Sequence, residues 1–288
     1  MKLSTAIILV FVVLLWGSSF TILKLGLEKI PPITLASLRF LITLPLLIAF
    51  AYMKKSDLGI TLRRNWRTFS ILGLTGITLC HILQNFGLKF ATVSNASLII
   101  TSNPIYIALI GHYYLKEKFT SRRIFGIAIA FFGVILVIRP LEWSLNPLSL
   151  IGNLLCLGTA LSWASYSILS RKILIKYDVN QVTTSSIIFG TLFLLPIAFT
   201  LEKPTIPASI EVWFLLLFLS LLCSGLGYLL WNKALEDAPA TEVSVFEFFI
   251  PVTSILIAHF VLSESIDDLL IYGAILIMLG VFITEYTR

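Results

Sequence analysis

The chain has 288 residues, of which 58% are hydrophobic and only 12% are charged, and its mean hydropathy is +0.97. A soluble domain of this length needs a charged surface, so the composition excludes an ordinary soluble protein and indicates an integral membrane protein. The net charge of +6 comes from Lys and Arg residues that flank apolar segments, and it does not indicate nucleic-acid binding.

About ten apolar stretches of roughly 20 residues are each long enough to cross the hydrocarbon core as a helix. The predicted spans are residues 4–24, 33–53, 68–88, 92–115, 122–139, 149–172, 180–200, 211–233, 240–262 and 267–285. The connections between them are short, so no soluble domain of any size is expected. The first stretch lacks a convincing cleavage site and has a counterpart later in the chain, which favours a retained helix over a signal peptide.

The positive charges divide unequally between the two sides of this arrangement. With the N-terminus placed inside, fifteen of the 21 Lys and Arg residues fall in inside segments and five in outside segments, while Arg39 lies within a span. The positive-inside rule therefore predicts that both termini are cytoplasmic. The basic run from Lys54 to Arg67 is interpreted as a topology anchor that contacts lipid headgroups.

The second half of the chain repeats the first at an offset of 147 residues. The offset relates pairs of scarce residue types, namely Trp16/Trp163, Asn85/Asn232, Pro104/Pro251, His112/His259, Glu117/Glu264, Gly126/Gly273 and Gly133/Gly280. Each half holds five predicted spans, and because five is odd, the second copy is inverted in the bilayer. We predict an all-α fold of ten transmembrane helices in two inverted five-helix repeats, residues 1–140 and 141–288, around a central cavity.

The last two spans of each half share a pattern of proline, glutamate and two glycines. Pro104 and Pro251 are predicted to be structural hinges, because a proline inside a helix removes a backbone hydrogen bond and bends the helix. The two glycines lie seven residues apart on one helical face, so they permit close approach of a neighbouring helix.

The order of these motifs resembles that of the drug/metabolite transporter superfamily, and of EamA-type transporters within it. The resemblance covers essentially the whole chain and is carried by Trp16-Gly17-Ser18-Ser19-Phe20, by Arg39-Phe40 and by the Pro…Glu…Gly…Gly hairpin of both halves. It implies a carrier of the plasma (inner) membrane that moves small organic metabolites, often amino acids or related compounds, usually outward. It also implies a central cavity lined mainly by spans 1, 3, 4, 6, 8 and 9.

Four positions at membrane depth break the symmetry of the repeat at polar residues: Arg39/Ser186, His81/Tyr228, Gln84/Trp231 and Ile100/Glu247. Ionisable groups at this depth are costly and usually face a cavity or a partner. Glu247 is interpreted either as a cavity residue, for proton coupling or for a substrate amine, or as a locally satisfied buried carboxylate.

Arg39, His81 and Gln84 form a predicted outer polar cluster in which the guanidinium holds a substrate carboxylate. The alternative is a structural arginine that is bonded to backbone carbonyls or extends to the membrane surface, since the resemblance places span 2 outside the main cavity wall. The rise of a helix separates Arg39 from Glu247 by roughly 10 Å in depth, which argues against a direct ion pair.

Aromatic and amide side chains provide the remaining candidate cavity residues. The aromatic set is Trp16, Trp163, Tyr166, Tyr228 and Trp231, and it fits either helix packing or a pocket for an apolar side chain or a cation. Trp163 and Tyr166 are three residues apart and share one helical face. The candidate amide donors are Asn85, Asn103 and Asn232, although Asn85 and Asn232 equally fit a role at helix ends.

Several motifs are missing from the sequence. It contains no Walker loop, HExxH or GxSxG, which excludes ATP as the direct energy source and argues against hydrolases of those types. The histidines and cysteines lack metal-ligand spacing, so no metal, cofactor or enzymatic activity is predicted. Cys80, Cys156 and Cys223 are interpreted as small packing residues.

We therefore predict a monomeric secondary or facilitated transporter that binds a small-molecule substrate in the bilayer and works by alternating access. Coupling to protons through Glu247 is one hypothesis. Two alternatives stay open. The first is efflux of cationic drugs or polyamines by the same fold, and the second is a non-transporting membrane subunit or lipid-handling protein.

Overall fold

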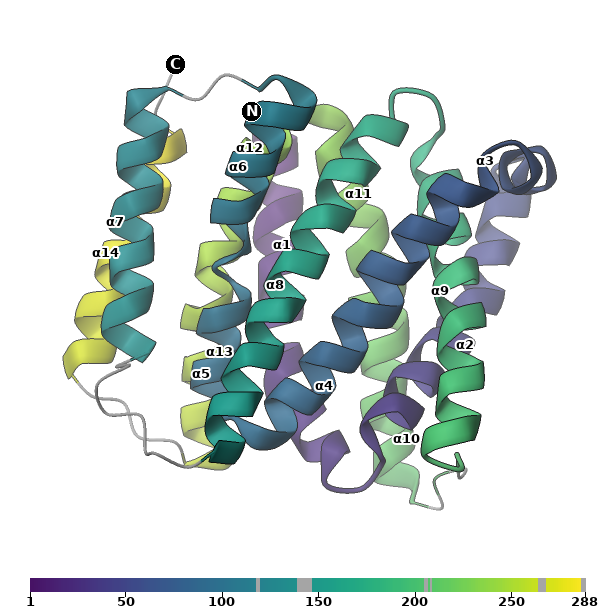
Figure 1. Cartoon of the computed structure of the whole chain (residues 1–288), viewed down its shortest axis with the longest axis horizontal. Helices are drawn as coiled ribbons and strands as arrows, with labels where there is room; N and C mark the ends of the chain where they lie inside the picture. The colour runs from purple at the N-terminus through teal and green to yellow at the C-terminus, as the bar shows by residue number, and fades with distance from the viewer. Residues whose placement is uncertain (118–119, 139–146, 205–206, 208, 264–267, 286–288) are drawn as a thin grey trace.

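The computed structural model describes residues 1–117, 120–138, 147–204, 207, 209–263 and 268–285, and all regular structure within these ranges is helical. The helices stand side by side in one bundle, and α1 begins at the same end of the bundle at which α14 finishes (Figure 1). The prediction of an all-helical protein is therefore confirmed for the part of the chain that the structure describes.

The helices of the first half are α1 (Leu3–Leu27), α2 (Pro32–Met53), α3 (Leu58–Gly73), η1 (Leu74–Leu79), α4 (Cys80–Phe90), α5 (Val93–Ile100), α6 (Asn103–Leu115) and α7 (Ser121–Ile138). Those of the second half are α8 (Pro147–Ile173), α9 (Val179–Leu201), α10 (Ile210–Leu217), η2 (Phe218–Leu226), α11 (Gly227–Asp237), α12 (Ala240–Ser244), η3 (Val245–Phe249), α13 (Ile250–Leu262) and α14 (Asp268–Glu285).

Eight helical segments are long and apolar enough to cross a membrane. They are Leu3–Leu27, Pro32–Met53, Thr61–Phe90, Val93–Leu115, Pro147–Ile173, Val179–Leu201, Ile210–Asp237 and Ala240–Leu262. Each corresponds to one of the predicted spans, although the third begins at Thr61 and not at residue 68. The other two predicted spans correspond to α7 and α14, which lie beside each other at one edge of the bundle (Figure 1).

Four of the spans are interrupted near the pocket described below. The segments Thr61–Phe90 and Ile210–Asp237 contain π-helical turns, η1 and η2, and Ala240–Leu262 contains the 3₁₀ segment η3. The fourth is broken between α5 and α6. Pro104 and Pro251 occupy the first turn of α6 and α13, where a missing N–H removes no helical hydrogen bond. The two prolines therefore begin the second part of an interrupted span. The prediction that they bend a continuous helix is wrong.

The glycines of the repeat bring α7 and α14 into backbone contact. A Cβ atom placed on Gly133 would lie 2.6 Å from the Gly273 carbonyl, and one on Gly280 would lie 2.4 Å from the Gly126 carbonyl. No side chain fits at either point, so the close approach predicted from the glycine spacing is confirmed.

Glu117 joins the two halves at one end of the bundle. Its carboxylate accepts hydrogen bonds from the backbone N–H groups of Ala240 and Thr241, at 2.9 and 3.1 Å, and from the Thr241 hydroxyl. A carboxylate at this position satisfies the free N–H groups that begin α12. Its repeat counterpart, Glu264, lies outside the described residues.

Polar residues lie inside the bundle and many large apolar residues lie outside, as expected of a protein whose solvent is lipid. Arg39, His81, Asn103 and Glu247 are each no more than 4% exposed. Long apolar side chains such as Phe199 and Phe282 are more than half exposed. Buried polar groups need partners or a cavity, so these interior residues direct attention to the space between the two halves.

Candidate functional site

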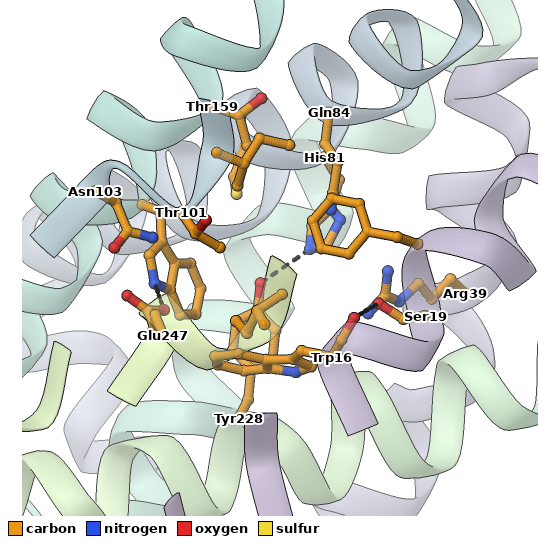
Figure 2. Close-up of a pocket in the computed structure, with 15 residues that line it drawn as sticks. Trp16, Ser19, Arg39, His81, Gln84, Thr101, Asn103, Thr159, Tyr228 and Glu247 are labelled. Atoms are coloured by element: carbon orange, nitrogen blue, oxygen red, sulfur yellow. Dashed lines mark hydrogen bonds between the residues drawn. The ribbon is translucent and has the colours of Figure 1, made fainter. Parts of the chain in front are cut away.

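A buried pocket between the two halves gathers most of the predicted site residues (Figure 2). It is lined by Trp16, Ser19, Phe20, Arg39, Cys80, His81, Gln84, Ile100, Thr101, Asn103, Thr159, Trp163, Tyr228, Glu247 and Ile250. Its free volume is about 60 Å³. Small-molecule pockets usually measure roughly 300–1,000 Å³, so the side chains that line this pocket leave less space than such a ligand needs.

Arg39 reaches the pocket from α2 and is held by η2. Its Nε atom donates to the Leu219 carbonyl at 3.2 Å and to the Ser224 hydroxyl. The wide turns of a π-helix leave carbonyl groups free to accept side-chain donors, and η2 also accepts from Trp16 and Thr43. Within the described chain no hydrogen bond occupies the two terminal nitrogens of Arg39, so they are available to a ligand.

This arrangement combines both interpretations of Arg39. The guanidinium is bonded to the backbone, as the structural alternative predicts, and it also lines the pocket. The expectation that span 2 lies outside the cavity wall is therefore wrong at this residue. Arg39 is long enough to pass between its neighbours and reach the space between the halves.

Glu247 lies in η3, where the Ala240–Leu262 segment is interrupted. Its Oε1 atom accepts from the indole N–H of Trp163 at 2.7 Å, and Asn103 lies beside it (Figure 2). Its Oε2 atom is buried and has no hydrogen-bond partner among the described residues. A buried carboxylate oxygen without a partner is costly, and a donor group or a bound proton at Oε2 would lower that cost.

His81 and Tyr228, which are counterparts in the repeat, meet across the pocket. Their Nε2 and hydroxyl oxygen are 2.9 Å apart, and the Tyr228 hydroxyl donates its one proton to the Gly76 carbonyl at 2.7 Å. The hydroxyl must therefore accept from His81, which places the proton of a neutral imidazole on Nε2. The remaining nitrogen, Nδ1, is buried and has no hydrogen-bond partner within the described ranges.

Five aromatic rings form a packed layer at one side of the pocket. Trp163 lies at its centre, with ring centroids 5.1 Å from Trp16 and Tyr166, 5.4 Å from Tyr228 and 5.6 Å from Trp231. Trp163 and Tyr166 are stacked, as their shared helical face predicted. Such contacts add stability beyond area burial and give the pocket a stiff apolar wall.

Four predicted site residues do not line the pocket. Trp231 and Tyr166 lie behind Trp163 in the aromatic layer, and both are almost fully buried. Asn85 donates to the Pro32 carbonyl in the first turn of α2 at 2.8 Å, so it binds the backbone and not the pocket. Its counterpart Asn232 donates to Tyr166 and Thr183.

Seven lining residues were not predicted from the sequence, namely Ser19, Phe20, Cys80, Ile100, Thr101, Thr159 and Ile250. Ser19 and Phe20 belong to the Trp16-Gly17-Ser18-Ser19-Phe20 segment, which was a usable signal. Thr101 lies in the break of the fourth span, which the sequence did not locate. Cys80 was interpreted as a packing residue, and nothing in its sequence context indicates a cavity.

A polytopic membrane protein with broken helices and buried polar groups around a pocket between two halves has the features of a solute carrier. The model of the EamA-like transporter family matches the chain twice, over residues 3–139 and 150–286. The chain belongs to the EamA-like transporter family. It is thus an integral membrane transporter and not an enzyme.

Similar proteins agree with this assignment. An uncharacterized transporter of Archaeoglobus fulgidus is 32% identical over 294 residues, which cover 99% of this chain and 98% of that protein. A probable amino-acid metabolite efflux pump of Escherichia coli is 27% identical, with 99% and 96% covered. A crystal structure with 21% identity superposes with a TM-score of 0.78 over 98% of this chain and 96% of the other, which shows a shared fold.

Proposed function

We propose that this transporter moves small zwitterionic metabolites such as amino acids outward across the plasma membrane by alternating access. One observation carries the proposal. Arg39 and Glu247 line the same pocket, from opposite sides in Figure 2, and no ion pair joins them within the described ranges. The pocket therefore offers a cation and a carboxyl group to one small ligand.

The two groups match the two ends of an amino acid. The free terminal nitrogens of Arg39 suit a carboxylate, which arginine binds with two parallel hydrogen bonds. The free Oε2 of Glu247 suits an ammonium group, and Trp163 orients that carboxyl group through Oε1. The aromatic layer offers an apolar surface to the substrate side chain. The relative of E. coli that is named a probable amino-acid metabolite efflux pump supports the same substrate class.

Ten transmembrane helices in two inverted repeats form part of the proposal. Reciprocal contacts support it, because Gly133 meets Gly273 while Gly280 meets Gly126. This exchange of contacts between equivalent positions is what a two-fold axis produces. His81 and Tyr228 are also equivalent positions and bond to each other, which supports a two-fold axis that passes close to both.

The proposed cycle follows from the closed pocket and the aromatic layer. With both termini cytoplasmic, α8 runs toward the cytoplasm, so Tyr166 lies about one helical turn nearer to it than Trp163 does. The layer then acts as the inner barrier, and a free volume of about 60 Å³ requires that the wall open before a substrate enters. We expect a functional monomer, since both charged groups of the pocket come from the same chain.

Matched ligands test the substrate class. Purified protein in detergent is heated with phenylalanine or leucine, with the amine that lacks the carboxylate, or with the acid that lacks the amine. A ligand at 100 times its dissociation constant adds roughly 2.7 kcal/mol, so binding is visible as a higher melting temperature. We expect stabilisation by the amino acid only, and counterflow of the same amino acid in proteoliposomes.

Two variants assign the roles. Arg39→Gln should abolish stabilisation by the amino acid, and Glu247→Gln should do the same, whereas Arg63→Gln at the exposed end of α3 serves as the control. Unchanged counterflow by Glu247→Gln, at every pH, would exclude both amine binding and proton coupling by this residue. Stabilisation by amines alone, insensitive to Arg39→Gln, would replace the proposal with efflux of organic cations.

A further inference from the structure

A second hollow lies on the outside of the bundle, between α2 and the η2–α11 segment. Its lining is apolar and includes Leu46, Phe50, Leu226 and Leu229. Thr43 also lines it, but its hydroxyl is already bonded to the carbonyls of its own helix and of η2. The hollow has a volume of about 420 Å³, within the roughly 300–1,000 Å³ of small-molecule sites.

This groove opens toward the lipid and not toward the pocket between the halves. Leu46 and Met53 on its rim are 56% and 80% exposed. Its floor is low because Gly225 of η2 has no side chain, and a Cβ atom there would meet only ordinary contacts at 3.4 Å or more. Within a bilayer, the molecules that reach such a surface are the acyl chains of lipids.

A positive charge stands at one end of the groove. α2 finishes at Met53, and the side chain of the next residue, Lys54, folds back over a groove residue. Its Nζ atom lies 5.7 Å from the centre of the Phe50 ring. Lys55 follows directly and is exposed. Apolar lining that ends in an ammonium group at the end of a membrane-spanning helix matches a phospholipid in both parts, chain and headgroup.

We propose that this groove is a binding site for one anionic phospholipid, with an acyl chain between α2 and η2–α11 and the phosphate on Lys54. A chain that leaves the bilayer for the groove stays in an apolar medium, so headgroup charge decides which lipid is retained. A lysine near anionic lipid contributes enough for about a fivefold preference over a zwitterionic lipid. The site is separate from the proposed substrate pocket and does not depend on the substrate class.

Native mass spectrometry measures the site directly. The full chain is purified in detergent with equal amounts of dioleoyl phosphatidylglycerol and dioleoyl phosphatidylcholine, and the retained lipid is identified by mass. We expect one phosphatidylglycerol per chain, preferred at least fivefold. Lys54→Gln should reduce the preference about fivefold, and Lys89→Gln, which removes an exposed lysine elsewhere, should not.

Ala49→Trp tests the groove itself, because Ala49 lines it and is exposed. The indole should occupy the acyl-chain site, so that retention of either lipid falls at least fivefold. Leu192→Trp on the exposed face of α9 is the control. Since Lys54→Gln adds no bulk, it remains informative should Ala49→Trp fail to fold.

Three results would overturn the inference. They are equal retention of the two lipids by the native chain, full retention by a folded Ala49→Trp variant, and a lipid-free dimer that Ala49→Trp converts to monomer. The last would assign the groove to a second copy of the chain. None of these measurements involves solute transport, so their outcome neither supports nor contradicts the proposed function.

Discussion

The hydrogen bond between Trp163 and Glu247 gives the sharpest test of the pocket. Trp163→Phe keeps an aromatic ring in the layer but removes the N–H that lies 2.7 Å from Oε1. Because Oε2 already lacks a partner among the described residues, this variant removes the one hydrogen bond of Glu247 that the geometry shows. An unsatisfied buried polar group costs about 1–3 kcal/mol of folding free energy.

The smaller ring also removes packing contacts, so a single variant does not isolate the hydrogen bond. Glu247→Leu supplies the second arm, because replacing both partners by apolar groups is close to neutral. In the Glu247→Leu background, Trp163→Phe should cost about 1–3 kcal/mol less than in the native chain, since only packing is then lost.

The assay is reversible unfolding in mixed micelles. It gives the free energy of unfolding of the native chain, the two single variants and the double variant. The coupling energy is the difference between the cost of Trp163→Phe in the two backgrounds. A difference within about 0.5 kcal/mol of zero would mean that the two side chains act independently. Trp163 would then not orient the carboxyl group that is proposed to bind the substrate.

Three further outcomes are expected. Gly280→Ala should lower the free energy of unfolding by about 1–3 kcal/mol, because its Cβ would lie 2.4 Å from the Gly126 carbonyl, whereas Gly225→Ala should change it little. Glu117→Ala should cost about 1–3 kcal/mol and speed amide hydrogen exchange at the start of α12, and unchanged exchange would disprove the cap. Tyr228→Phe should shift the imidazole ¹⁵N signals of the histidine it contacts, and unaltered signals would contradict the assigned tautomer.

Much of the site could be predicted from broken symmetry. Arg39, His81, Tyr228 and Glu247 were selected because a repeat that keeps its scaffold differs there in polar residues, and all four line the pocket. Asn85 was selected by residue type alone, and it bonds to a backbone carbonyl of α2. Polar character at membrane depth indicates that a group needs a partner, but not whether that partner is backbone or substrate.

Depth along a helix did not predict that Arg39 and Glu247 line the same pocket. Counting residues placed them roughly 10 Å apart and in separate clusters. Within the described chain no ion pair joins them, as predicted, yet both side chains line one pocket. Long side chains and interrupted helices bring together groups whose backbone positions are distant, and sequence spacing does not record either effect.

The apolar helices, the internal repeat and the glycine contact of α7 with α14 could be predicted from the sequence, since they depend on composition and on spacing along one helix. The folded chain was needed to show where the helices break, that η2 holds Arg39, and which nitrogen of His81 carries the proton. The difference is physical. The backbone hydrogen bonds of a helix in lipid are made within its own segment, whereas these features depend on hydrogen bonds between residues far apart in the chain.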